Sequence, residues 1–231
     1  MPQYPQPDTR TLVMACATVI EEMLPLLPEG MQHQVFDFGL HTNPSRLRAT
    51  LQEAIDALSG AYDTIILGYG MCSQAIIGLR ANGARLVVPR VDDCIAMFLG
   101  SRGAYSAQCQ AEPGTYYLTK GWIEVGDTPF TDYDFSVQRY GKERAEMIYK
   151  MMMGNYRRLA LINTGQYELE KYREYTRRTA ERFGLRFEEI EGSDALIRKM
   201  LFGPWDEDFV VLAPGETFRI QQFYNFEEGA V

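Results

Sequence analysis

Apolar runs alternate with more polar stretches along the first half of the chain, and each run has the length of a β-strand. The runs span residues 11–16, 33–39, 63–70 and 85–90. The third, DTIILGYG, is almost continuously apolar, which is typical of a parallel strand buried on both faces. Helical patterns separate the runs, and this alternation predicts βαβ units with a parallel sheet.

The stretch after the second run has the periodicity of a helix. Asn43 is suited to the N-cap and Pro44 to the first turn. Apolar side chains then recur at i, i+4, i+8 and i+11, which predicts one buried helix face made of Leu47, Leu51, Ile55 and Leu58.

The second half of the chain repeats this order of elements. Apolar runs at 158–165, 185–192 and 208–215 are separated by helical patterns. We therefore predict an α/β fold of two Rossmann-like β-α-β-α-β halves with parallel strands, related as a pseudo-repeat. The segment 112–140 is rich in aromatic residues, Gly and Asp, and we expect it to be irregular apart from a strand at TYYLT.

These patterns predict four segments. Residues 1–10 form a flexible arm, 11–125 a first α/β lobe that carries the cysteines, 126–157 a linker with a connecting helix, and 158–231 a second α/β lobe.

Charge and the length of the apolar runs argue against several classes of partner. The net charge of −8 argues against a broad nucleic-acid or anionic-membrane surface. No apolar run approaches the length of a membrane span, and the N-terminus lacks the pattern of a secretory signal. We therefore expect a cytoplasmic protein that binds a small-molecule ligand, with no nucleic acid and no membrane as partner. The sequence leaves the oligomeric state open.

Three of the four cysteines fall at or just after the carboxyl ends of predicted strands: Cys16, Cys72 and Cys94. His41 follows the second strand in the same way. Such ends meet at one edge of a parallel sheet, where ligands bind. Each cysteine also precedes a predicted helix, whose N-terminus favours the thiolate that metals bind. The alternative is that each cysteine is a small buried apolar side chain.

This pattern predicts a metal site made of Cys16, Cys72, Cys94 and His41. Three cysteines can hold a [4Fe–4S] iron–sulfur cluster with one iron open to substrate. The same residues can instead bind Zn²⁺, as a closed structural site with His41 or as a catalytic site with one open position. Cys109 follows a helix in a polar stretch, and we interpret it as incidental.

The loop LGYGMCS resembles a dinucleotide loop but has Ser73 where a third glycine is expected. Its glycines more simply let the backbone approach a ligand closely. We therefore predict that Gly68, Tyr69, Gly70 and Ser73 contact a cofactor held near Cys72.

Charged residues beside Cys94 are the candidate catalytic groups. Arg90 can hold an anionic substrate through two hydrogen bonds, and Asp93 adjoins the thiol. The alternative for Arg90 is a surface ion pair with Asp92 or Asp93. In the first helical stretch, Glu21 and Glu22 are expected to face solvent, with an inward-facing Glu21 as the alternative.

Five motifs together resemble a family called domain of unknown function 1638. They are Cys16 with Glu21 or Glu22, LHxxP, LGYGxC, PRxxDC followed by LGS, and GTYYLTxGW. The resemblance covers nearly the whole chain. It implies an occurrence in anaerobes, often near genes of corrinoid methyltransferases, so that a corrinoid or methyltransferase protein is a possible partner. Where the family commonly has a histidine before the Asp-Cys pair, this chain has Asp92, which weakens a second-histidine site.

The leading hypothesis is a metal-dependent protein that handles a small molecule in anaerobic one-carbon or methyl-transfer metabolism. One alternative is a metal-free cysteine enzyme of the racemase type, but such enzymes carry a cysteine in each lobe and the second half here has none. Another is a non-catalytic module that binds a small molecule or cofactor. The sequence does not decide whether the protein is an enzyme.

Overall fold

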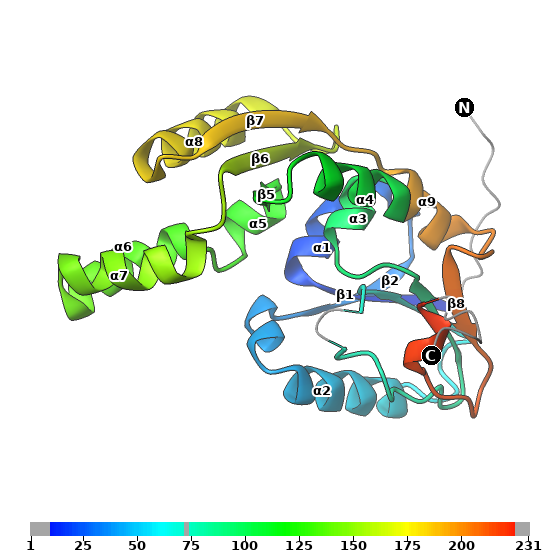
Figure 1. Ribbon diagram of the computed structural model, residues 1–231. Coiled ribbons are helices and arrows are strands. Elements are labelled where there is room, and N and C mark those ends of the chain that lie inside the picture. Colours follow the sequence, from blue (N-terminus) through cyan, green and yellow to red (C-terminus); the bar gives the residue numbers. More distant parts are fainter. Residues whose placement is uncertain (1–9, 72–73, 225–231) are drawn as a thin grey trace, which may run out of the picture.

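The chain folds into two β-sheets surrounded by helices (Figure 1). The computed structural model describes residues 10–71 and 74–224. The first sheet has the strand order β2-β1-β3-β4-β8. Its strands are β1 (Thr11–Cys16), β2 (Gln32–Phe36), β3 (Thr64–Gly68), β4 (Arg85–Pro89) and β8 (Phe209–Leu212).

The first four strands of this sheet are parallel, and β8 pairs antiparallel with β4. All residues of β1 and β3 are buried, as expected for central parallel strands covered on both faces. Helix α2 (Pro44–Ala57) lies on one side of the sheet, and α1 (Ala17–Met23) lies on the other, toward the second sheet (Figure 1).

Helix α2 forms as its sequence predicts. The side chain of Asn43 accepts a hydrogen bond from the Arg46 N–H at 3.0 Å, and Pro44 occupies the first turn. Leu47, Leu51 and Ile55 are fully buried, and Leu58 packs at the border of the same core.

The second sheet is parallel and three-stranded, in the order β5-β6-β7. Its strands are β5 (Thr115–Leu118), β6 (Arg158–Asn163) and β7 (Arg186–Glu191). Helix α8 (Leu169–Phe183) packs on β6 and β7. The hairpin of α6 (Pro129–Tyr140) and α7 (Lys142–Met153) projects away from the sheets (Figure 1).

The remaining helices are short. They are α3 (Ile95–Phe98), α4 (Arg102–Ala111), α5 (Lys120–Glu124) and α9 (Ala195–Phe202), and short 3-10 turns occur at Leu24–Leu26, Phe38–Thr42 and Ile220–Gln222. Helices α1 and α5 pack very closely, and the absence of a side chain at Gly121 allows this approach. A Cβ atom at that position would lie 2.5 Å from the Thr18 carbonyl oxygen.

The α/β class with parallel-strand sheets is confirmed, and the Rossmann-like order of the first half agrees with the prediction. The structure corrects the strand assignment of the second half. The strand β8 joins the first sheet rather than the second, and β5 joins the second sheet from within the predicted first lobe. In the segment 112–140 the predicted strand at TYYLT is present as β5, but the rest is not irregular, since it contains α5 and α6.

The predicted arm is outside the described residues except for Arg10. Within residues 10–71 and 74–224, no helix is both long enough and apolar enough to cross a membrane.

Candidate functional site

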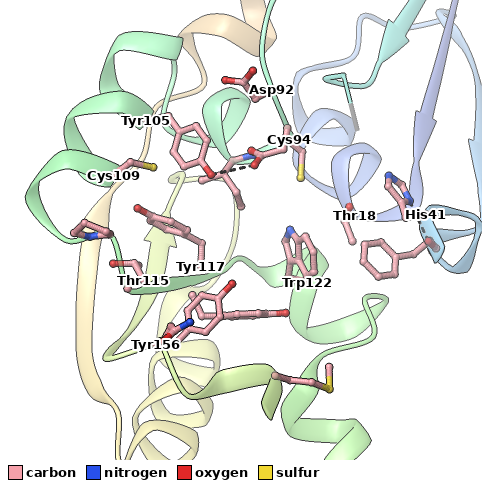
Figure 2. A pocket seen from close by; sticks show the side chains of 18 residues that line it. Thr18, His41, Asp92, Cys94, Tyr105, Cys109, Thr115, Tyr117, Trp122 and Tyr156 are labelled. Carbon is pink, nitrogen blue, oxygen red and sulfur yellow. Dashed lines mark hydrogen bonds between the residues drawn. The ribbon is translucent and has the colours of Figure 1, made fainter. Parts of the chain in front are cut away.

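A cavity of about 810 Å³ lies where the carboxyl ends of the first sheet's strands face β5 and its flanking segments. Figure 2 shows Tyr105, Cys109, Thr115 and Tyr117 on one side, Thr18 and His41 on the other, and Cys94 and Trp122 between them. The wall also includes Phe38, Asp92, Asp93, Ile95, Pro113, Gly114, Tyr116, Met152, Asn155 and Tyr156. Both sheets therefore contribute to one site.

Cys94 lies on the wall of this cavity, directly before the first residue of α3. The loop is held by Asp93, whose Oδ1 accepts a hydrogen bond from the Ile95 N–H at 2.9 Å. The other oxygen of Asp93 accepts from the Tyr105 hydroxyl at 3.0 Å. Burial raises the pKa of Asp93, and these two hydrogen bonds partly oppose that shift.

His41 lies on the same wall, in the turn Phe38–Thr42. Its Nδ1 is 3.0 Å from the Phe38 carbonyl oxygen, so Nδ1 carries the proton and Nε2 keeps its lone pair. The imidazole stacks on the rings of Phe38 and Tyr69, with centroids 5.2 and 6.0 Å away. Burial lowers the pKa of His41, which favours the neutral imidazole.

Cys16 ends β1 as predicted, but its thiol is not on the cavity wall. The sulfur is 3.1 Å from the hydroxyl oxygen of Thr18, which does line the cavity. Burial raises the pKa of Cys16, and the hydrogen bonds from Thr18 and the start of α1 only partly oppose this. The expectation that the helix N-terminus favours a thiolate is therefore outweighed by desolvation at this position.

The glycines of the LGYGMCS loop serve packing within the protein. A Cβ atom on Gly68 would lie 2.8 Å from the Cβ of Ala15, and one on Gly70 would lie 2.8 Å from the Asp93 Cα. The Met71 N–H also bonds to the Val91 carbonyl at 2.9 Å. These contacts hold the loop after β3 against the loop that carries Asp93 and Cys94.

Of the other predicted cofactor contacts, Tyr69 is buried in the core beneath His41 and is not on the cavity wall. Ser73 and Cys72 lie outside the described residues, so their predicted roles stay predictions.

Arg90 is also away from the cavity wall. Its guanidinium donates to the Phe209 carbonyl of β8 at 3.5 Å, and its backbone N–H bonds to the Asp208 carbonyl at 2.7 Å. The structure therefore brings together His41, Asp93 and Cys94 from the predicted set, and it places Arg90 at the β4–β8 pair.

Among the residues that the structure describes, no three His, Cys, Asp or Glu side chains form a group that could hold a metal ion. Cys16, Cys94 and His41 therefore do not form such a group by themselves. A metal site of the predicted composition would have to include Cys72.

Sequence reasoning missed several residues of the cavity. Cys109 lies on its wall, one helical turn after Tyr105 on α4, so it is not incidental in position. The rings of Tyr116, Tyr117 and Tyr156 form much of the wall. The available signal was the dense aromatic motif GTYYLTKGW, which also carries the family resemblance.

Glu22 was expected to face solvent and is instead fully buried. Its Oε2 accepts a hydrogen bond from the Thr164 hydroxyl at the end of β6. Burial raises the pKa of Glu22 to about 7, despite this hydrogen bond. The neighbouring Glu21 is the partly exposed one and pairs with Lys120 at 2.8 Å.

Comparison with known proteins gives a family and nothing more specific. The profile of a family described as "Protein of unknown function (DUF1638)" matches residues 35–201, which is more than half of the chain. No curated protein and no solved structure matches the chain. The matched range includes His41, Cys94 and the motif GTYYLTKGW. The chain therefore belongs to the family described as Protein of unknown function (DUF1638).

Proposed function

We propose that this protein binds and handles a small organic molecule in the cavity between its two sheets. The observation that carries this proposal is that polar groups from two separate segments, His41 from the turn after β2 and Asp93 and Cys94 from the loop after β4, line one cavity of about 810 Å³. A concave site with aromatic walls and a few convergent polar groups is the usual form of a small-molecule site. Its position beyond the carboxyl ends of parallel strands also supports the proposal.

The groups at the site offer proton transfer and a thiol nucleophile. Neutral His41 has Nε2 available as an acceptor, because Nδ1–H is bonded to the Phe38 carbonyl. Cys94 directly precedes α3, and it lies on the cavity wall. These groups allow either simple binding of the ligand or acid–base and thiol chemistry on it. The proposal is that the ligand binds in the cavity, whether or not a reaction follows.

Binding is tested by saturation-transfer NMR with benzyl alcohol as a neutral aromatic probe. The unmodified protein should transfer saturation to the probe. Asn155→Trp places an indole at the exposed rim of the cavity and should abolish the transfer, because it blocks the entrance. Asn82→Trp makes the same change at an exposed site away from the cavity and should have no effect. Equal signals from both variants would overturn the proposal.

A metal centre made of Cys16, Cys72, Cys94 and His41 is a second candidate. The observation in its favour is the Nδ1–H hydrogen bond of His41, because ligand histidines usually donate their other ring N–H to an acceptor in this way. Cys94 lies on the same cavity wall, and Cys16 contacts Thr18 on that wall. When bound, zinc would activate a thiol or water, and an iron–sulfur cluster would offer an open iron to the ligand. A role in anaerobic methyl transfer rests on the family resemblance alone.

Metal analysis of anaerobically purified protein tests this second candidate. We expect either about one zinc per chain or visible absorption from an iron–sulfur cluster. Serine at Cys16, Cys72 or Cys94 should each remove the metal, whereas Cys109→Ser should retain it. Full metal content in the triple serine variant would reject the metal centre and leave a metal-free binding site.

A further inference from the structure

The aromatic rings on the cavity wall meet at steep angles. Phe38 and Trp122 have centroids 4.9 Å apart and an interplanar angle of 73°. Tyr116 lies at 82° to Trp122 and at 69° to Tyr156, with centroids 6.3 and 5.6 Å apart. Rings arranged in this way present π-faces as well as edges to the space that they border. The negative electrostatic potential of those faces attracts cations.

The charged groups on the wall are acidic. Asp92 and Asp93 line the cavity, and among the described residues no lysine or arginine lines it. The two oxygens of Asp93 accept from the Ile95 N–H and the Tyr105 O–H, and both hydrogen bonds favour the ionised carboxylate against the opposing effect of burial. The wall therefore has acceptors and π-faces, with no cationic side chain to hold an anion.

Two arginines beside the cavity wall, Arg158 and Arg102, are paired with acids. Arg158 is buried behind Thr115, to which it donates at 2.7 Å, and it pairs with Glu188 at 3.2 Å. Arg102 is half-exposed and lies 3.9 Å from Asp92. Asp92 is thus partly balanced by Arg102, which leaves Asp93 as the acid available to a ligand. The net charge of −8 further favours the approach of a cation.

We propose that the cavity binds an organic cation, a substituted ammonium ion whose alkyl groups contact the rings of Trp122 and Tyr116 and whose charge is balanced by Asp93. This inference rests on the proposed small-molecule function and specifies its ligand class. A substituted ammonium fits because it has few or no N–H groups to hydrogen-bond, and aromatic faces replace its hydration. Anionic ligands would meet Asp93 with no compensating cation.

Choline and 3,3-dimethyl-1-butanol are the probes, because they share a shape and differ in charge. The chain has two tryptophans, Trp122 and Trp205. In a Trp205→Phe background, fluorescence therefore reports on the cavity through Trp122 alone. We expect choline to change this fluorescence and to bind about tenfold more tightly than the neutral alcohol.

Variants separate charge from structure. Asp93→Asn keeps the shape, removes the charge and leaves one acceptor oxygen, which the Ile95 N–H can take at the expense of the hydrogen bond from Tyr105. It should weaken choline binding about tenfold while leaving binding of the alcohol unchanged. Tyr105→Phe breaks the same hydrogen bond but keeps the charge, so choline binding should be retained. Asp206→Asn, at an acid paired with Lys199 away from the cavity, is the matched control and should bind choline normally. Thermal melting confirms that each variant is folded.

The outcomes distinguish this inference from the proposed function. Equal affinity for choline and the alcohol, or loss of choline binding in Tyr105→Phe as well as in Asp93→Asn, would overturn the cation assignment. Binding of benzyl alcohol without any binding of choline would also overturn it, and the small-molecule function would stand. Failure of benzyl alcohol to bind would count against the proposed function itself.

Discussion

Thr164 donates its hydroxyl hydrogen to the carboxyl group of Glu22 across 2.5 Å, at the junction of the two sheets. Thr164 follows β6 of the second sheet, and Glu22 lies on α1 beside the first sheet. Glu22 is fully buried, and Tyr167, Lys120 and Glu21 are the titratable groups whose charges interact with it. Burial outweighs the stabilising contacts and raises the pKa of this carboxyl to about 7.

The buried carboxyl predicts a pH dependence of stability. Between the unfolded-state pKa of about 4.5 and the folded-state pKa of about 7, the folded chain binds one more proton than the unfolded chain. The contribution of Glu22 to the free energy of unfolding is therefore fully present below pH 4.5. It is lost as the pH rises through 7, and the free energy of unfolding falls by about 1.4 kcal/mol per pH unit. Glu22→Gln should remove this decline and make the protein more stable at pH 8, by urea unfolding.

The neighbouring acid provides the control. Glu21→Gln makes the same change one residue away, at a partly exposed side chain paired with Lys120. It should leave the decline between pH 4.5 and 7 intact. If Glu22→Gln keeps the same pH profile as the unmodified chain, Glu22 does not carry this linkage.

A second prediction concerns the contact between α1 and α5. Gly121→Ala puts a Cβ atom 2.5 Å from the Thr18 carbonyl oxygen, so the helices must separate. We expect the free energy of unfolding to fall by about 1–3 kcal/mol. Gly103→Ala is the matched control on α4, where the nearest atom would be 3.9 Å away, and its stability should be unchanged or slightly higher. Similar free energies of unfolding for the two variants would show that α1 and α5 are not in tight contact at Gly121.

A third prediction concerns the buried guanidinium of Arg158, which is only 4% exposed. It donates to Thr115 and to Gln108 at 2.7 and 2.9 Å, and so connects α4 to the second sheet. Arg158→Met should lower the free energy of unfolding by about 2–4 kcal/mol, because it leaves these partners unsatisfied. Arg186→Met removes an exposed guanidinium that pairs with the same Glu188 and should have little effect. Equal losses in both variants would contradict the argument.

A fourth prediction concerns thiol accessibility. In a Cys72→Ser background, iodoacetamide should alkylate the half-buried Cys109 at least about tenfold faster than Cys16. Cys16 is 2% exposed, and burial raises its pKa, so it has little thiolate. Mass spectrometry of peptides over time measures both rates. Comparable rates would mean that the end of β1 opens readily to solvent.

Local patterns predicted the first half of the fold well. The cap at Asn43, the buried face of α2 and the buried strand β3 are all present. The same reasoning failed for the partner of β8, because a short apolar run looks alike whether it joins one sheet or another. Pairing of β8 with β4 joins residues 120 to 126 positions apart, and hydrophobic periodicity carries no information on such contacts.

The candidate site was predictable only in part. Strand ends placed Asp93, Cys94 and His41 at one edge, and the structure brings them to one cavity. The opposite wall comes from α4, β5 and the end of α7, whose approach depends on how the sheets pack. The burial of Glu22 was missed for a similar reason, since α1 has only seven residues and its buried face is set by α5 and Thr164.

The family's matched range, residues 35–201, does not contain the whole first sheet. It omits β1, which lies between β2 and β3, and it omits β8, which covers the outer side of β4. A fragment cut to these limits would lose a central strand and expose unpaired backbone along β4, and such open strand edges promote aggregation. Expression trials and evolutionary comparisons of these proteins should therefore use chains that reach from β1 to at least Phe223, whose side chain is buried in the same core.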